Sequence, residues 1–222
     1  MAATWDSAYL LSMFNRKAGR PSSGDTIDDL SKYQRLSESQ NRVVAMLSGI
    51  MPQVLYPSAI PTLTTADGGY TFTFGTDANG YNIAPMGKAG IYDNLASIPY
   101  FPWVDGVQYL DEGTRIRIPN NGTYSGTLWW RGITPPADID ATHQPALFPE
   151  ASRELIVMDA VRQFAGEPGG DPATQQTMQG EWEKAWPQWC LVWRTQFRHG
   201  GALGTGFTGF QLALGSAGGY SL

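Results

Sequence analysis

The chain has little of the chemistry on which most enzymes and secreted proteins depend. Its 222 residues include one cysteine, Cys190, and two histidines, His143 and His199. A single cysteine excludes a disulfide within the chain and fits synthesis in the reducing cytoplasm, where Cys190 is expected to be a buried, inert thiol. No acid–base pair or nucleophile–base set is visible, so we expect no catalytic residues and no bound cofactor.

Charge is also scarce. Charged residues make up 16% of the chain, the net charge is −5, and lysine and arginine form no cluster. Proteins that bind nucleic acid by neutralising phosphates need a basic patch, so this composition argues against that class. No run of about 18 apolar residues is present, which predicts a soluble protein without a membrane span.

Enough apolar residues remain to build a core, since 42% of the chain is hydrophobic and 12% aromatic. The pattern predicts an α+β fold, in which a helical body of about four helices encloses a β-rich insertion and ends in an extended arm. The predicted parts are residues 1–57 (N-terminal helical part), 58–148 (β-rich insertion), 149–199 (C-terminal helical part) and 200–222 (C-terminal arm).

Caps and prolines locate the four helices. We expect them to begin at residues 4–6, 25–26, 149–150 and about 173, where Ser, Thr, Asp or Pro suits a helix start. The second helix should carry a polar patch at 37–40 and an apolar face made of Ile27, Leu30, Val43, Val44, Leu47 and Ile50. Pro187 should kink the last helix or mark its true beginning. In the middle, residues 66–69 and 111–113 predict the turns of two hairpins.

Several polar clusters have ordinary structural interpretations. Asp25, Asp28 and Asp29 could in principle bind a hard cation, but they lack the regular ligand spacing of a calcium loop. Capping of the second helix explains them better, and we expect no metal. His199 is explained as a cation near a helix C-terminus.

Tryptophans supply the first candidate interaction residues. Trp182, Trp186, Trp189 and Trp193 lie on one helical face, which more often belongs to a core than to an interface. Trp129 and Trp130 are adjacent in a predicted strand, so one should face the core and the other should be exposed or covered by a partner.

The C-terminal arm supplies the others. Residues 200–222 contain no charge and eight glycines, yet they carry several large apolar side chains. Disordered tails are normally polar and charged, so this composition favours an arm that docks on another subunit over a terminus that lies on its own domain. The candidate partner-binding residues of the arm are Leu203, Phe207, Phe210, Leu212, Leu214 and Tyr220.

Five segments, taken in order, resemble a known family. They are RKAGRP (16–21), PQVLYP (52–57), LTTADGGYTFTFG (63–75), EGTRIRIPNN (112–121) and PEASRELI (149–156). Over about residues 5–165 the chain resembles the head–tail adaptor, or connector, proteins of tailed bacteriophages.

The resemblance implies a non-enzymatic virion protein that is made in the host cytoplasm and located in the neck. Such proteins form a ring, typically of twelve subunits, that binds the portal protein, extends the DNA channel and offers a platform to the tail or to a stopper protein. DNA would pass without sequence-specific binding. Residues 58–148 hold four basic and eight acidic side chains, which suits such a channel.

Two alternatives stay open at this point. The same resemblance allows a stopper or tail-completion protein of the same neck. A carbohydrate- or receptor-binding module that uses Trp103, Trp129 and Trp130 as a stacking surface is the alternative from a different class.

Overall fold

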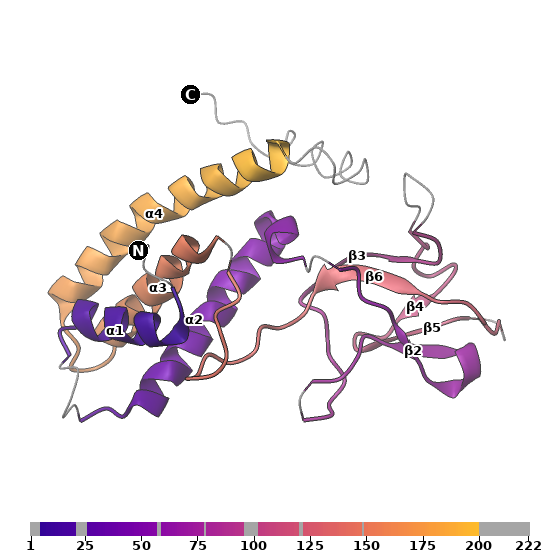
Figure 1. The fold of residues 1–222 in the computed structure, drawn as a ribbon, viewed down its shortest axis with the longest axis horizontal. Coiled ribbons are helices and arrows are strands. Elements are labelled where there is room, and N and C mark those ends of the chain that lie inside the picture. Colours follow the sequence, from indigo (N-terminus) through magenta and orange to yellow (C-terminus); the bar gives the residue numbers. More distant parts are fainter. Residues whose placement is uncertain are drawn as a thin grey trace. The chain divides into compact units, whose positions relative to one another are not determined.

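The computed structural model describes residues 5–20, 26–56, 59–77, 79–95, 102–119, 122–147 and 149–199. Its contacts divide the chain into a helical unit, made of the residues up to Tyr56 together with Ile133–Trp193, and a β-rich unit built on Pro57–Gly132 (Figure 1). This is the predicted α+β fold, with helices at both ends and a β-rich middle. No helix in the described ranges is long and apolar enough to cross a membrane.

The described part of the helical unit contains four α-helices. Their bounds are α1 Ser7–Lys17, α2 Asp29–Ile50, α3 Glu154–Ala165 and α4 Pro172–His199. Short 3-10 helices follow α2 at Pro52–Leu55 and precede α3 at Glu150–Arg153. The centre of the unit is α3, which packs against α1 and α2 and is buried along most of its length because its sequence is apolar on nearly every side.

Aspartates fix the helix starts. The carboxylate of Asp6 accepts a hydrogen bond from the backbone N–H of Tyr9 at 2.8 Å, and that of Asp28 accepts from the N–H of Ser31 at 2.6 Å. This bond lowers the pKa of Asp28 below its usual value, because it stabilises the charged form. Capping by Asp28 is thus confirmed, but α2 begins at Asp29 and not at 25–26. As a result Leu30 lies in the first turn and is 76% exposed, so it does not belong to the apolar face that Val43, Val44 and Leu47 bury.

The last helix is continuous past Pro187, so this proline does not mark its beginning. It runs from Pro172 to His199 and continues through Pro187, which lies on its exposed side. A proline inside a helix removes one backbone hydrogen bond. We attribute the continuity of α4 to the tryptophans of the two flanking turns, which are packed against one another.

The described strands of the β-rich unit form two sheets. The first has the order β1-β2-β5-β4, all antiparallel, and the second pairs β3 with β6. The bounds are β1 Thr64–Thr65, β2 Thr71–Thr73, β3 Gly87–Tyr92, β4 Leu110–Asp111, β5 Arg115–Arg117 and β6 Trp129–Ile133. Both predicted hairpins are confirmed, since β1 pairs with β2 around residues 66–69 and β4 pairs with β5 around 112–114.

The first hairpin depends on a glycine. Gly69 has φ +99°, which is favourable only without a side chain, and a Cβ at this position would lie 2.4 Å from the carbonyl oxygen of Tyr124. The close approach brings Tyr124 against the hairpin, where its N–H donates to the Gly69 carbonyl at 3.2 Å.

Residues from both sheets share one hydrophobic core. Its buried members are Leu63, Phe72, Phe74, Ile91, Ile116, Leu128 and Trp130. The indole of Trp130 lies edge-on to Phe74, with ring centroids 5.0 Å apart. Burial also raises the pKa of Tyr92, Tyr109 and Tyr124 around this core, because the phenolate is poorly solvated there.

We expect Trp130→Ala to lower the free energy of unfolding by about 3–5 kcal/mol, because it removes the largest side chain of the core and leaves a cavity. Equilibrium urea unfolding followed by far-UV circular dichroism measures the change. Tyr81→Ala is the matched control: this side chain is exposed, and its truncation should change stability by less than about 0.5 kcal/mol. Equal effects of the two substitutions would contradict the assigned core.

Candidate functional site

The four indoles of α4 form a continuous aromatic row. Trp182 stacks on Trp186 with centroids 5.3 Å apart, and Trp193 contacts both Trp186 and Trp189 at 6.4 and 6.0 Å. Trp182 and Trp193 are buried and the other two are half-buried. The Nε1–H of Trp189 donates to the carboxylate of Glu154 on α3 at 2.7 Å. The row is therefore largely a packing face, which was the favoured interpretation of the pattern.

The second half of α4 has an unusual exposed surface. Residues 185–193, here called the uncharged segment, contain no charged residue. Pro187 and Gln188 are exposed, Leu191 is 66% exposed and Val192 is 38% exposed. Helix surfaces that face water normally carry charges, so two and a half turns without any are typical of a surface that is covered in an assembly.

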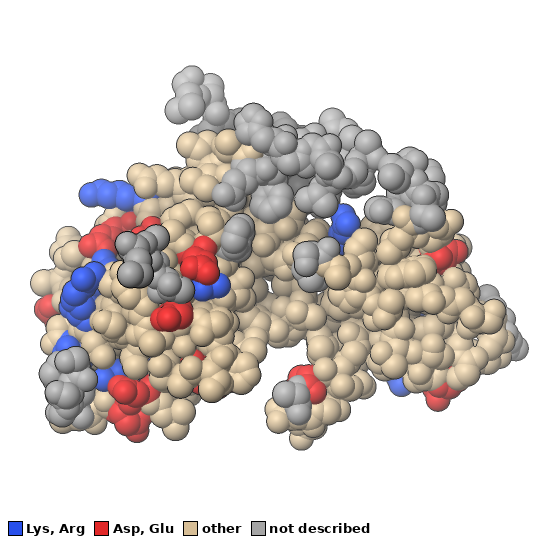
Figure 2. All heavy atoms as spheres, viewed as in Figure 1, with Lys and Arg blue, Asp and Glu red and all other residues tan. Residues whose placement is uncertain are grey.

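Charge distinguishes this segment from its surroundings. On the face drawn in Figure 2, basic and acidic side chains lie interspersed over the helical unit. The first half of α4 takes part in this pattern, since Glu181 pairs with Lys17 of α1 at 2.5 Å. The change from charged to uncharged surface thus occurs within a single helix.

The predicted strand tryptophans occupy different environments. Trp130 is 1% exposed and belongs to the core of the β-rich unit, whereas its neighbour Trp129 is half-buried. This alternation is what the strand pattern predicted. Trp103 is also half-buried and lies edge-on to Tyr124, with centroids 5.2 Å apart. In this structure Trp130 has no surface to offer a partner.

The other candidate residues belong to the C-terminal arm. Leu203, Phe207, Phe210, Leu212, Leu214 and Tyr220 lie outside the described residues. Their role in partner binding remains a prediction from sequence.

A buried carboxylate joins three helices beneath the start of α4. Asp159 of α3 is fully buried and accepts hydrogen bonds from the Nε of Arg42 on α2 at 2.8 Å and from an Nη of Arg162 at 2.5 Å. The same Arg162 donates to Gln179 of α4 at 2.8 Å and lies over the indole ring of Trp182. This arrangement contributes to the packing of α4 on α3, and nothing in the sequence pattern indicated it.

Next to Asp159 lies an open polar cavity of about 400 Å³. It is lined by Arg35, Glu38, Arg42, Ala160, Gln163, Gly166, Glu167, Pro168 and Gln175. Arg35 pairs with Glu167, and Arg42 pairs with Asp159, so both guanidinium groups have a counter-charge within the chain. The cavity is best explained as the junction of α2, α3 and α4.

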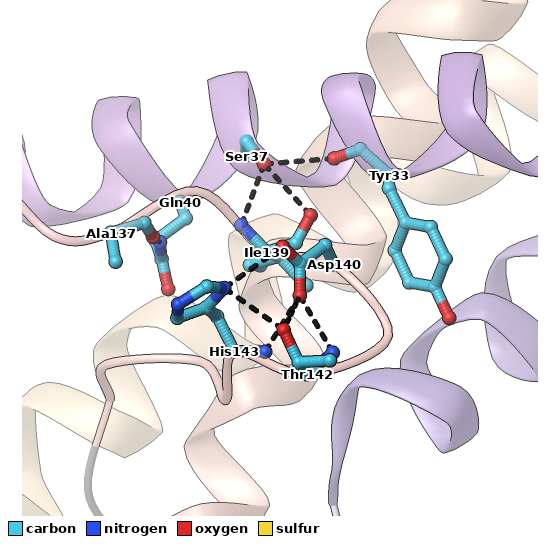
Figure 3. Close-up of polar contacts among 8 residues, drawn as sticks. All are labelled: Tyr33, Ser37, Gln40, Ala137, Ile139, Asp140, Thr142 and His143. Atoms are coloured by element: carbon cyan, nitrogen blue, oxygen red, sulfur yellow. Dashed lines mark hydrogen bonds and ion pairs between the residues drawn. The ribbon is translucent and has the colours of Figure 1, made fainter. Parts of the chain in front are cut away.

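A second polar cluster connects α2 to the chain that returns from the β-rich unit (Figure 3). The hydroxyl of Ser37 accepts from the N–H of Ile139 at 2.8 Å. The amide of Gln40 donates to the carbonyl of Ala137 at 2.9 Å and accepts from the N–H of Ala146 at 2.8 Å. These bonds give the irregular segment 137–146 the backbone partners that it would otherwise take from water.

This cluster shows two features that the sequence pattern did not indicate. Ser37, Ser39 and Gln40 are buried, so the polar patch of α2 is an internal contact. Residues 133–147, which the sequence division placed in the β-rich part, belong by their contacts to the helical unit. A polar run on a helix does not reveal that its partner is another segment of the same chain.

One group in this segment superficially resembles a catalytic triad. The Nδ1 of His143 lies 2.8 Å from the carboxylate of Asp140 and 3.2 Å from the hydroxyl of Thr142 (Figure 3). In a triad the acid and the nucleophile contact opposite ring nitrogens, whereas here both contact Nδ1. The Thr142 hydroxyl also donates directly to Asp140 at 2.7 Å. The arrangement stabilises an exposed turn, and the bonds from His143 and Thr142 lower the pKa of Asp140 well below its usual range.

No protein-family model matches the chain, and no curated protein matches its sequence.

Replacing Asp159 by Asn is expected to cost about 3–5 kcal/mol of stability, because it leaves Arg42 and Arg162 without their buried counter-charge. Urea unfolding measures the loss. In the control, Glu181→Gln removes the more exposed pair with Lys17 and should cost less than about 1 kcal/mol. A loss at Asp159 no larger than that of the control would show that the carboxylate is not structurally important.

The turn at Asp140 gives a pH-dependent prediction. Because the folded pKa is depressed, the turn is stabilised at pH values above the unfolded pKa of about 3.9, and this contribution is lost as pH falls through the lower folded pKa. A carbon-13 NMR titration of the aspartate carboxyl groups, with Asp140→Asn to assign the signal, measures the value directly. Titration of Asp140 at or above about 3.9 would contradict the hydrogen-bonded turn.

Proposed function

We propose that this protein is a structural head–tail adaptor of a tailed bacteriophage. Identical subunits would form a ring under the portal, extend the DNA channel and present the attachment platform for the tail. The protein would act in the virion neck, as an interaction protein without catalytic activity. In such a ring each subunit uses one surface to contact the next subunit and a different surface to receive the previous one.

One observation supports this proposal most strongly. The uncharged segment of α4 exposes Leu191 and Val192, and the same helix leads directly into the uncharged, apolar C-terminal arm. Both surfaces need cover from water, and their low charge suits a protein whose faces are buried by neighbours. Exposed apolar surface does not stabilise an isolated monomer, whereas in an assembling subunit the same surface stabilises the contact with a neighbour.

Three of the five segments that resemble the adaptor family lie at defined places in the fold. PQVLYP (52–57) forms the 3-10 turn after α2, where the chain leaves the helical unit. LTTADGGYTFTFG (63–75) contains the β1–β2 hairpin. PEASRELI (149–156) contains the 3-10 turn and the first residues of α3.

The electrostatics of the β-rich unit agree with a DNA channel. Arg115 and Arg117 both pair with Glu112, and Lys88 pairs with Asp111. Basic side chains that are already paired with acids attract phosphates weakly, so DNA would slide past such a surface without binding tightly.

The positions of the tryptophans favour an adaptor over a carbohydrate-binding module. A stacking platform needs exposed, neighbouring aromatic faces. Trp130 is instead buried, and Trp103 packs edge-on against Tyr124. A stopper or tail-completion protein of the same neck would need the same uncharged surfaces for assembly. The two roles differ in the partner that the protein contacts.

The proposal is tested by mixing the purified protein with the portal protein encoded by the same genome and examining the mixture by negative-stain electron microscopy. We expect a ring seated on the portal. Binding to the tail or to a preformed ring, but not to the portal, would indicate the stopper alternative. A monomer that ignores the portal and is retained on polysaccharide would contradict the proposal.

The arm is tested with two variants of equal charge. Phe207→Asp with Phe210→Asp should abolish ring formation or portal binding, because charge is placed at apolar anchors. Thr205→Asp with Thr208→Asp adds the same charge at neighbouring polar positions and should assemble nearly normally. Both variants should melt like the wild type, and loss of assembly in both would mean that charge alone, not the apolar anchors, decides the result.

A further inference from the structure

Two surfaces in the described part of the chain expose large apolar side chains in pairs. Leu191 and Val192 lie side by side in the uncharged segment of α4. Val104 and Val107, which are 56% and 69% exposed, lie three residues apart just before β4. The other large apolar residues that the described ranges expose occur singly in the sequence, which is normal for a protein surface: Leu30, Met46, Tyr70 and Tyr81. The two pairs are therefore the surfaces that most need a partner.

Residues 104–108, here called the valine turn, form a tight turn that satisfies its own hydrogen bonds. The N–H groups of Val107 and Gln108 donate to the carbonyl of Val104 at 3.2 and 2.9 Å. The N–H of Val104 in turn donates to the side-chain oxygen of Gln108 at 2.8 Å. Gly106 has φ +75°, a left-handed conformation that suits glycine in a turn. The first and fourth Cα atoms of such a turn lie within about 7 Å, so the two valines form one apolar tip.

The only charge of the valine turn is used within the chain. The carboxylate of Asp105 accepts a hydrogen bond from the N–H of Gly106 at 2.8 Å and from that of Asp111 at 3.2 Å, which ties the turn to β4. The turn contains no lysine or arginine. A surface without cations suits neither DNA phosphates nor an anionic membrane, whereas it can approach an uncharged protein surface without repulsion.

The uncharged segment of α4 offers a surface of matching chemistry. Pro187 and Leu191 are four residues apart, as are Gln188 and Val192, so they form two neighbouring rows on the helix. All four side chains are exposed and none is charged. Side chains from a partner pack into the grooves beside such rows, and here they would bury apolar surface without desolvating a charge.

We propose that the valine turn of one subunit packs on the uncharged segment of α4 of the next subunit. This inference rests on the proposed function, since it names the two surfaces that join neighbours in the ring. A ring of identical subunits requires two different, complementary surfaces on every copy. The valine turn belongs to the β-rich unit and the uncharged segment to the helical unit, so each chain carries one of each.

Disulfide cross-linking between two single-cysteine chains tests the contact. Both chains carry Cys190→Ala. One also carries Gln188→Cys on α4, and the other, enlarged by a tag, carries Val107→Cys in the valine turn. Cysteine is small and apolar, so it keeps part of the tip. The two chains are mixed, assembled with the portal protein, oxidised and separated on a denaturing gel. We expect a cross-linked pair of one tagged and one untagged chain.

The matched control moves the second cysteine to another exposed turn of the β-rich unit. Tyr81 is 73% exposed, about as much as Val107, and Tyr81→Cys with Gln188→Cys should give at least about tenfold less product. Equal yields from the two pairs would overturn the proposal. When every chain carries both Val107→Cys and Gln188→Cys, contact between neighbours should give a ladder of cross-linked chains. Internal disulfides alone would show that the turn meets its own helix, and would also overturn the proposal.

The same samples separate this proposal from the proposed function, because electron microscopy before oxidation reports whether rings form. Rings without a cross-link between residues 107 and 188 would overturn the contact and leave the adaptor function in place. A cross-link without rings would support the contact, in a smaller oligomer, and contradict the proposed function. If neither forms with the portal present, both are overturned.

Discussion

The buried carboxylate of Asp159 is the interaction on which the helical unit depends. It lies on the most buried helix, contacts Arg42 from α2, and through Arg162 reaches Gln179 and Trp182 of α4. A charge without a partner in this position would be costly, so the helices can pack only in the arrangement that brings both guanidinium groups to it. The Arg162 contacts hold the first half of α4 against α3, together with the hydrogen bond from Trp189 to Glu154 and the ion pair of Glu181 with Lys17.

A second constraint acts where the chain enters and leaves the β-rich unit. Ser37 and Gln40 supply hydrogen bonds to the returning segment 137–146, and Arg153 donates to the carbonyls of Leu147 and Trp5. Burial lowers the pKa of Arg153, because its charge is partly removed from water. Polar side chains on α2 and before α3 thus determine the path of a segment that has no regular structure of its own.

Much of the fold could be predicted from sequence, because it rests on local signals. Asp6 and Asp28 cap helices, residues 66–69 turn a hairpin, and the spacing of the tryptophans places them on one face of α4. What could not be predicted depends on contacts between distant segments. The pairing of Asp159 with Arg42 and the burial of Gln40 join residues more than 90 positions apart, and the sequence pattern of each segment alone resembles an ordinary polar surface. The adjacent residues Trp129 and Trp130 of β6 show both cases. The alternation of side chains along a strand predicted that the two differ in burial, but only the packing of the core decided that Trp130 is the buried one.

In the proposed function, the uncharged, apolar parts of this chain are covered by other subunits of an assembly. Hydrogen–deuterium exchange of the free protein and of the protein assembled with its portal tests it most directly, because backbone amides of residues 203–214 report whether the arm becomes ordered. We expect these amides to exchange rapidly in the free protein and to be strongly protected in the assembly. Equal exchange in the two states would contradict it.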